Sequence, residues 1–133
     1  MTKKSNHLSN ILAPVSLGEL IDKITILEIK MANMKGLKLK NVDKELGLLK
    51  YILLDKNLEI NVDLINSLRE VNNSLWKIED SIRIKESKKE FDKEFVQLAR
   101  AVYRENDRRA SIKKEINQKY NSELVEEKSY KNT

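Results

Sequence analysis

The stretch LINSLREVNNSLWKIEDSI, residues 64–82, carries the apolar stripe that decides the fold class. Its apolar side chains recur every three or four residues, at Leu64, Leu68, Val71, Leu75, Ile78 and Ile82. This spacing is typical of an amphipathic α-helix that packs against other helices. The pattern predicts a helix that begins after Asn61 and ends near Ser87.

Three more helices are predicted around this one. The first should run over about residues 17–34, the second should begin after Asn41 and stop around Asn57, and the last should cover about residues 88–120. Three glycines and one proline leave few places where the chain can turn. Amphipathic helices with short connections predict an all-α fold, an antiparallel bundle of about four helices.

Two Ser-x-x-Glu pairs set the expected starts of two helices. Ser16 and Glu19 can form a capping box for the first helix, and Val15 can add a hydrophobic staple. Ser87 and Glu90 form the corresponding box for the last helix.

The length of 133 residues fits a single domain. Residues 1–13 are predicted to be a flexible arm, residues 14–121 the helical bundle domain, and residues 122–133 a C-terminal tail that is extended and able to pack on the bundle. The N-terminal residues lack the apolar run of a signal peptide, and no stretch reaches the roughly 18 apolar residues of a membrane span. A soluble cytoplasmic protein is therefore expected.

Composition argues against several chemistries. Cysteine is absent and the single histidine, His7, lies in the polar N-terminal tail, so no cofactor, thiol nucleophile or His/Cys metal site is expected. The formal net charge is +5, but acidic residues are scattered among the basic ones and aromatic residues are few. Nucleic-acid binding is therefore not expected.

Seven polar residues fall inside the apolar arcs of the predicted helices when each residue is advanced by about 100°. They are Glu28, Asn72, Glu79, Arg83, Asn106, Arg109 and Lys113. Because charges are rarely buried unpaired, these residues form a candidate ligand-binding polar layer, in which one positive charge is left over for an anion. A structural salt-bridge network or a solvated helix is the favoured interpretation, since Glu79 with Arg83 and Glu105 with Arg109 can form ordinary helix pairs. The last helix can also extend past the bundle, which would make its polar middle an exposed arm. The same projection places Asp22 toward the edge of the first arc and Glu19 on its solvent side.

Four blocks of the chain resemble a family of small all-helical bacterial proteins of unknown function. The blocks are PVSLGELIDKITILEIK, VNNSLWKIEDSIR, FVQLARAVYRENDRRASIKKEIN and VEEKSY, and the resemblance covers most of residues 14–130. It implies an all-helical fold, an unassigned role and a link to surface-polysaccharide and glycosyltransferase genes. It supplies no catalytic residue, but its blocks coincide with the inward polar residues.

These patterns favour a non-catalytic interaction or accessory protein, acting as a homodimer or with a protein partner, because no catalytic motif occurs. The alternative is a binding module or enzyme for a small anionic metabolite, held by Arg83, Arg109 and Lys113, with Glu28 or Glu79 orienting the cations or acting as a base. A weaker similarity to the helical chorismate mutases rests on the same three cations, although the first helix lacks the arginine those enzymes use. An acidic metal site would need paired acids on adjacent turns, which the sequence lacks.

Overall fold

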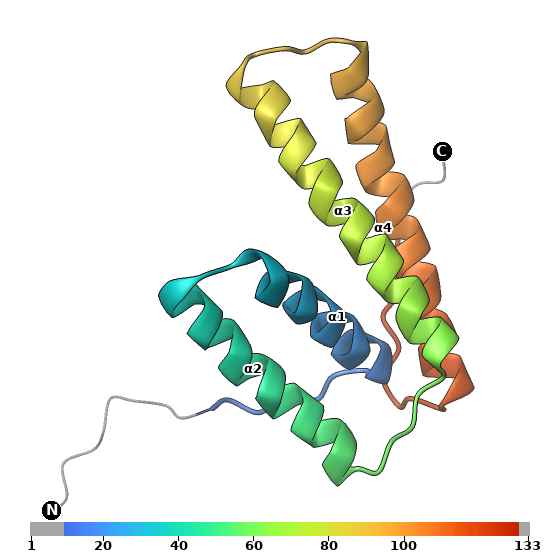
Figure 1. The fold of residues 1–133 in the computed structure, drawn as a ribbon. Helices are drawn as coiled ribbons and strands as arrows, with labels where there is room; N and C mark the ends of the chain where they lie inside the picture. The colour runs from blue at the N-terminus through green and yellow to red at the C-terminus, as the bar shows by residue number, and fades with distance from the viewer. Residues whose placement is uncertain (1–9, 131–133) are drawn as a thin grey trace, which may run out of the picture.

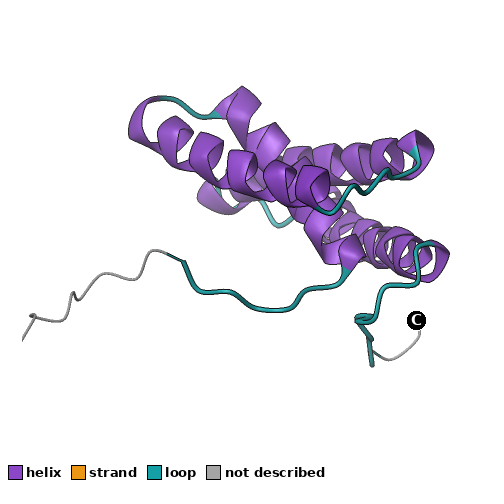
Figure 2. Ribbon diagram, turned by 90° about the horizontal axis from the view of Figure 1, so that it is seen from below, coloured by secondary structure: helices purple, strands orange, loops and turns teal. Residues whose placement is uncertain are grey.

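The computed structural model describes residues 10–130, which contain four helices. These are α1 (Leu17–Asn33), α2 (Gly36–Asp55), α3 (Val62–Ser87) and α4 (Lys93–Lys119) (Figure 1). Helices and loops make up this whole range, with no strand, as the view from below in Figure 2 shows. The predicted all-α fold is confirmed. Most of the predicted flexible arm, residues 1–13, lies outside the described residues.

The caps of α1 and α3 follow the sequence signals. The Ser16 Oγ accepts a hydrogen bond from the Glu19 N–H at 3.1 Å, and the Asn61 Oδ1 accepts one from the Asp63 N–H at 2.8 Å. Both caps satisfy N–H groups that have no partner inside the helix. Val15 remains more than half exposed, so the expected hydrophobic staple buries little surface.

The start of α2 differs from the prediction. The helix begins at Gly36 rather than after Asn41, so only Met34 and Lys35 separate it from α1. Leucine and lysine occupy residues 37–40, and both are good helix formers, so the helix extends back to the glycine. Gly36 has a φ of +65°, a left-handed conformation that glycine adopts without strain.

The predicted start of α4 is wrong. Ser87 does not cap α4, because its Oγ donates to a carbonyl in the last turn of α3, which continues to this residue. Asp92 is the N-cap, and its Oδ1 accepts from the Phe95 N–H at 3.0 Å. Glu90 forms an ion pair with Lys85 instead of completing a capping box.

The other helices pack around α1. One apolar cluster lies between α1, α3 and α4 and includes Ile21, Leu68 and Ile116, which are almost fully buried. A second cluster, which includes Leu27 and Val42, lies between α1 and α2. α2 has no close backbone contact with α3 or α4. α1 is therefore covered on two sides, as Figure 1 shows.

α3 and α4 lie side by side and extend past α1 and α2 (Figure 1). We call residues 77–105 of this hairpin the arm. No residue in the longer stretch 73–111 is buried. The arm therefore has no hydrophobic core of its own.

Polar and aromatic contacts hold the tip of the arm together. The Lys85 ammonium lies between 2.8 and 3.2 Å from three carboxylates, those of Asp92, Glu94 and Glu90. These contacts, with Asp92 the strongest, raise the pKa of Lys85 above its ordinary value. Phe91 and Phe95 pack edge to face with ring centroids 5.2 Å apart. Ion pairs and an aromatic pair thus hold the turn between α3 and α4, although none of its side chains is buried.

Gly18 allows α1 and α4 to approach closely, and a side chain there should destabilise the fold. Its N–H donates to Asn117 Oδ1 at 2.7 Å, and a Cβ added to it would lie 2.5 Å from the Lys113 carbonyl oxygen. Because that contact is with backbone, Gly18→Ala should lower the free energy of unfolding by about 1–3 kcal/mol, measured by urea denaturation. Gly47→Ala is the control, since its Cβ would meet open space on α2 and should be neutral or stabilising by up to about 1 kcal/mol. Equal losses in both variants would contradict close packing at Gly18.

Candidate functional site

Asp22 of α1 is the centre of a buried polar network. Its side chain is only 1% exposed. Its Oδ1 accepts from Arg109 Nε and from Asn72 Nδ2, both at 2.9 Å, and the same guanidinium donates a second bond to Oδ2. Thr25 Oγ1 accepts from Asn72 at 2.8 Å. A carboxylate at this depth is stable only with such partners, so Asp22 ties α1 to both α3 and α4.

Lys113 of α4 connects this network to the C-terminal segment, residues 121–130. Its Nζ donates to Glu19 Oε2 at 2.6 Å and to Glu126 Oε2 at 2.8 Å. Burial alone would lower the pKa of Lys113, but the bonds to Glu126 and Glu19 outweigh burial and raise this pKa above its ordinary value. Hydrogen bonds from Lys113 and then Lys128 lower the pKa of Glu126 to about 2.

The C-terminal segment forms hydrogen bonds and ion pairs with the start of α1 and with α4. Ser122 Oγ accepts from the Leu17 N–H at 3.1 Å, at the start of α1. Farther along, Glu127 contacts Lys114 at 3.4 Å, next to the bond between Glu126 and Lys113. The segment runs without regular secondary structure, and side-chain bonds place it against α1 and α4.

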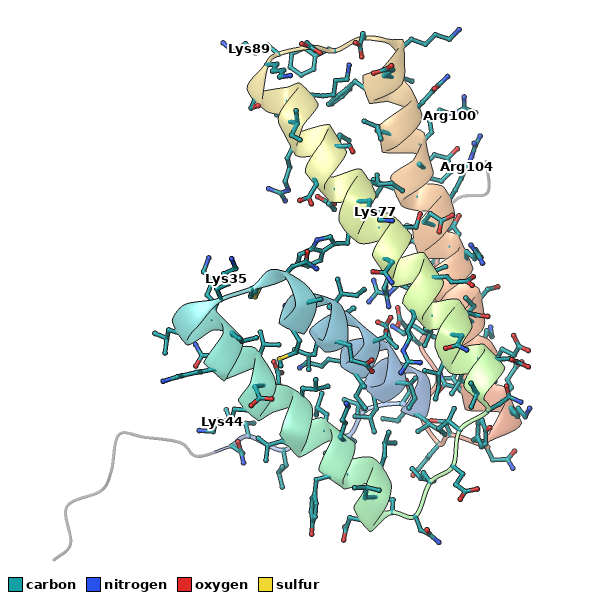
Figure 3. All side chains as sticks on the ribbon, in the orientation of Figure 1. Lys35, Lys44, Lys77, Lys89, Arg100 and Arg104 are labelled. Carbon is teal, nitrogen blue, oxygen red and sulfur yellow. The ribbon has the colours of Figure 1, made fainter. Side chains whose placement is uncertain are left out.

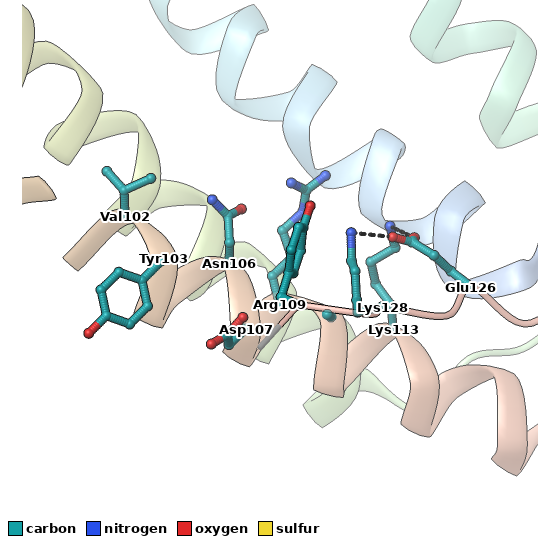
Figure 4. Close-up of a pocket in the computed structure, with 10 residues that line it drawn as sticks. Val102, Tyr103, Asn106, Asp107, Arg109, Lys113, Glu126 and Lys128 are labelled. Carbon is teal, nitrogen blue, oxygen red and sulfur yellow. Dashed lines mark hydrogen bonds and ion pairs between the residues drawn. The ribbon is translucent and has the colours of Figure 1, made fainter. Parts of the chain in front are cut away.

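A cleft of about 530 Å³, which we call the C-terminal cleft, lies between α4 and the C-terminal segment (Figure 4). Arg109 and Lys113 line one wall, and Glu126 and Lys128 line the opposite one. In Figure 4 both cations of α4 point toward α1 and the C-terminal segment. The volume falls in the range of about 300–1,000 Å³ that is usual for small-molecule sites.

A second cleft of about 440 Å³, the arm-base cleft, lies where α3 and α4 diverge from α1. Ile26 and Ile29 of α1 and Leu75 and Trp76 of α3 form its apolar wall. Arg109 lines both clefts. Trp76 is partly exposed, so it forms the wall of a cleft and is not a core residue.

The structure brings three of the seven predicted polar residues together. Asn72 and Arg109 bind Asp22 directly, and Lys113 lies 3.8 Å from the same carboxylate. They come from α3 and α4, as the helical projection predicted.

The other four residues do not join this network. Glu28 pairs with Arg69 at 3.2 Å, on the side of α1 that faces α3. Glu79 and Arg83 pair with each other at 3.2 Å at exposed positions of α3, and both line the arm-base cleft. Asn106 is exposed and lines both clefts.

Sequence reasoning missed the acidic half of the network. Asp22 was expected at the edge of the arc and Glu19 on the solvent side, yet both bind cations of α4. The buried arc of α1 is wider than its apolar arc because α2 packs on one side and α3 with α4 on the other. Gly18 was the available signal, since a glycine inside a helix indicates a close neighbour on that face.

The charges of the network balance without an anion. Its acids are Glu19, Asp22 and Glu126. Its bases are Arg109, Lys113 and Lys128. The three acids neutralise the three bases. The extra positive charge counted among the seven predicted residues is therefore absent from the assembled network.

A family model described as a family of unknown function, DUF6165, matches residues 12–133. The chain belongs to this family. Comparisons with curated proteins and with solved structures gave no match. The matched residues include all four helices and the C-terminal segment, so the network and both clefts lie within the region that characterises the family.

Two further observations bear on the type of site. Among residues 10–130, no helix has the length and apolar character needed to cross a membrane. The same residues contain no group of three or more His, Cys, Asp or Glu side chains arranged to hold a metal ion. The charged groups near α4 are instead arranged as cation–carboxylate pairs.

Neutralising Asp22 should destabilise the protein far more than neutralising an exposed acid. Asp22→Asn leaves Arg109 without its buried counter-charge and should lower the free energy of unfolding by about 3–5 kcal/mol in urea denaturation. Glu79→Gln breaks only the exposed pair with Arg83 and should cost less than about 1 kcal/mol. Comparable losses in the two variants would show that the network does not hold the helices together.

The bond between Glu126 and Lys113 should break in acid. The pKa of Glu126 is lowered from an ordinary value of 4.5 to about 2. The ionised Glu126 carboxylate therefore contributes its full stabilisation of the fold above pH 4.5, and this contribution is lost as the pH falls toward 2. NMR signals of residues 123–130 should therefore shift in that window. Glu126→Gln should remove this pH dependence. A midpoint near 4.5 for the Glu126 carboxyl itself would contradict its bond to Lys113.

Proposed function

We propose that the protein is a non-catalytic accessory protein that acts through protein contacts, with the arm as its binding element and a second copy of the chain as its partner. The observation that supports this function is the absence of any buried residue in the stretch 73–111. A hairpin of this length with no core of its own gains stability from covering by another protein.

Large apolar side chains are exposed along the arm. Phe91 is 59% exposed near the tip, Val96 is 53% exposed in the first turn of α4, and Tyr103 is 40% exposed toward the base. Exposed apolar surface that continues along one element is typical of a protein interface.

The seam between the two helices of the arm is a continuation of the covered seam below it. At the base, α1 packs over α3 and α4 and buries Leu68 and Ile116. Beyond α1 the same seam continues through Ile78, Leu98 and Val102, which are only partly buried. The arm thus lacks the covering helix that the base possesses.

A second copy of the chain is suited to cover this seam. Two helical hairpins that pack seam to seam form a four-helix bundle. Each copy contributes the same surface, so the contact closes on itself as a two-fold dimer. Arg100 and Arg104 point away from α3 (Figure 3), so these charges do not block the seam.

The link to surface-polysaccharide genes implied by the sequence resemblance is part of this proposal. A dimer without chemistry of its own would serve such a process by binding other proteins. Three observations favour this role over catalysis: the exposed arm, the self-neutralised polar network and the absence of cysteine from the sequence.

Size-exclusion chromatography with light scattering should detect this dimer. The native protein should show a mass near twice 15.5 kDa that falls with dilution. Leu98→Lys, which places a charge in the seam, should weaken association at least about tenfold, because an unpaired charge is costly to desolvate. Circular dichroism should show unchanged helix content.

Leu37→Lys is the matched control, because it introduces the same charge and Leu37 is exposed on α2 and remote from the arm. This variant should dimerise as the native protein does. A native protein that is monomeric at every concentration, or that loses its dimer equally in both variants, would overturn the proposal.

A further inference from the structure

We propose that the C-terminal cleft binds a small molecule that carries a phosphate or carboxylate group on a ring, with Arg109 and Asn106 holding the anion. This site adjoins the arm contact of the proposed function, because Val102 and Tyr103 line the cleft and belong to the arm, but Arg109 and Asn106 lie outside residues 77–105.

Arg109 has hydrogen-bond donors that the network does not use. A guanidinium carries five N–H groups, of which the bonds to Asp22 occupy two. The other three N–H groups have no acceptor within hydrogen-bonding distance among residues 10–130. The side chain is 27% exposed and lines both clefts, so these donors are accessible to a ligand.

The bonds to Asp22 orient Arg109. The guanidinium donates to both carboxylate oxygens of Asp22, which fixes its plane. A guanidinium held in this way loses little side-chain entropy when it binds a carboxylate or phosphate. The ligand needs only the spare donors, so the network stays intact on binding.

Asn106 places a second polar group beside Arg109. It precedes Arg109 by three residues on α4, so the two side chains project from neighbouring turns of one face. Both line the C-terminal cleft and the arm-base cleft. An amide next to a guanidinium can donate to a further oxygen of the same anion.

The remaining wall of the C-terminal cleft suits a ring. Val102, Tyr103 and Ala110 present apolar surface on α4, and Tyr130 lines the cleft from the C-terminal segment. The two tyrosine rings are flat surfaces that can pack against the face of a bound ring, and Val102 and Ala110 add apolar contact. The cleft therefore offers one polar position and one apolar position.

The mouth of the cleft is electropositive. The guanidinium groups of Arg100 and Arg104 lie beside the Tyr103 hydroxyl, outside the cleft lining, and hold the pKa of this hydroxyl below its ordinary value. Asp107 and Glu126 are the carboxylates of the lining, against Arg109, Lys113 and Lys128. The lining therefore carries one more positive than negative group, which favours the approach of an anion.

Two-dimensional NMR titration of the full chain tests this site. The probes are phenyl phosphate and benzoate, with inorganic phosphate as the anion alone and benzyl alcohol as the ring alone. Either ring-bearing anion should shift the amides of Tyr103, Asn106 and Arg109 saturably and bind more tightly than inorganic phosphate or benzyl alcohol. Comparing phenyl phosphate with benzoate separates a phosphate site from a carboxylate site.

Variants of α4 identify the residues that hold the anion. Asn106→Ala, at an exposed position, should leave the fold intact and weaken binding about tenfold, the effect of losing one hydrogen bond to a charged group. Arg109→Lys should weaken binding at least as much, and its spectrum reports whether the fold persists. Arg108→Ala is the control. It removes one positive charge next to Arg109, at a position that lines neither cleft, and this variant should bind the probes as the native protein does.

Three results would overturn the proposal. The first is the absence of saturable shifts at Tyr103, Asn106 and Arg109 with either ring-bearing anion. The second is weaker binding in Arg108→Ala together with unchanged binding in Asn106→Ala and Arg109→Lys, which would indicate charge attraction without a site. The third is equal affinity for inorganic phosphate and phenyl phosphate, which would remove the ring from the ligand class.

Discussion

The paired burial of Asp22 is the constraint on which the arrangement of helices depends. A carboxylate that is almost fully enclosed needs a cation and hydrogen-bond donors at fixed positions, and Arg109 and Asn72 supply them from two different helices. This requirement fixes the position along the helix axes at which α1 packs against α3 and α4. Apolar contacts alone would tolerate sliding, because leucine and isoleucine packing has little directionality.

The network also divides the molecule into two parts with different properties. From the network toward the start of α3 and the end of α4, these helices bury Leu68 and Ile116 against α1. Beyond the network, α1 diverges and the arm continues with no buried residue. Stability is therefore concentrated at the base, and the surface left for binding is concentrated on the arm and at the clefts beside Arg109. The same guanidinium serves the core with one edge and faces the clefts with the other.

Much of the fold could be predicted because local signals and packing agree. The apolar stripe of residues 64–82, with its start after Asn61, and the cap at Ser16 correctly indicated α3 and α1. The misplaced starts have a common cause, since several residues near each boundary satisfy the local rules equally well. Ser87 has the chemistry of a cap, but α3 still includes it, and Asp92 provides the cap once the chain has turned.

The number of helices, their apolar faces and the inward direction of Asn72, Arg109 and Lys113 follow from the sequence alone, because they depend on the angular period of a helix. Which charges meet depends on how the helices pack. Angular projection gives the side of the helix on which a residue lies. It does not give which neighbouring helix covers that residue at its position along the axis. For this reason Asp22 became the centre of the network, while Glu28 paired with Arg69.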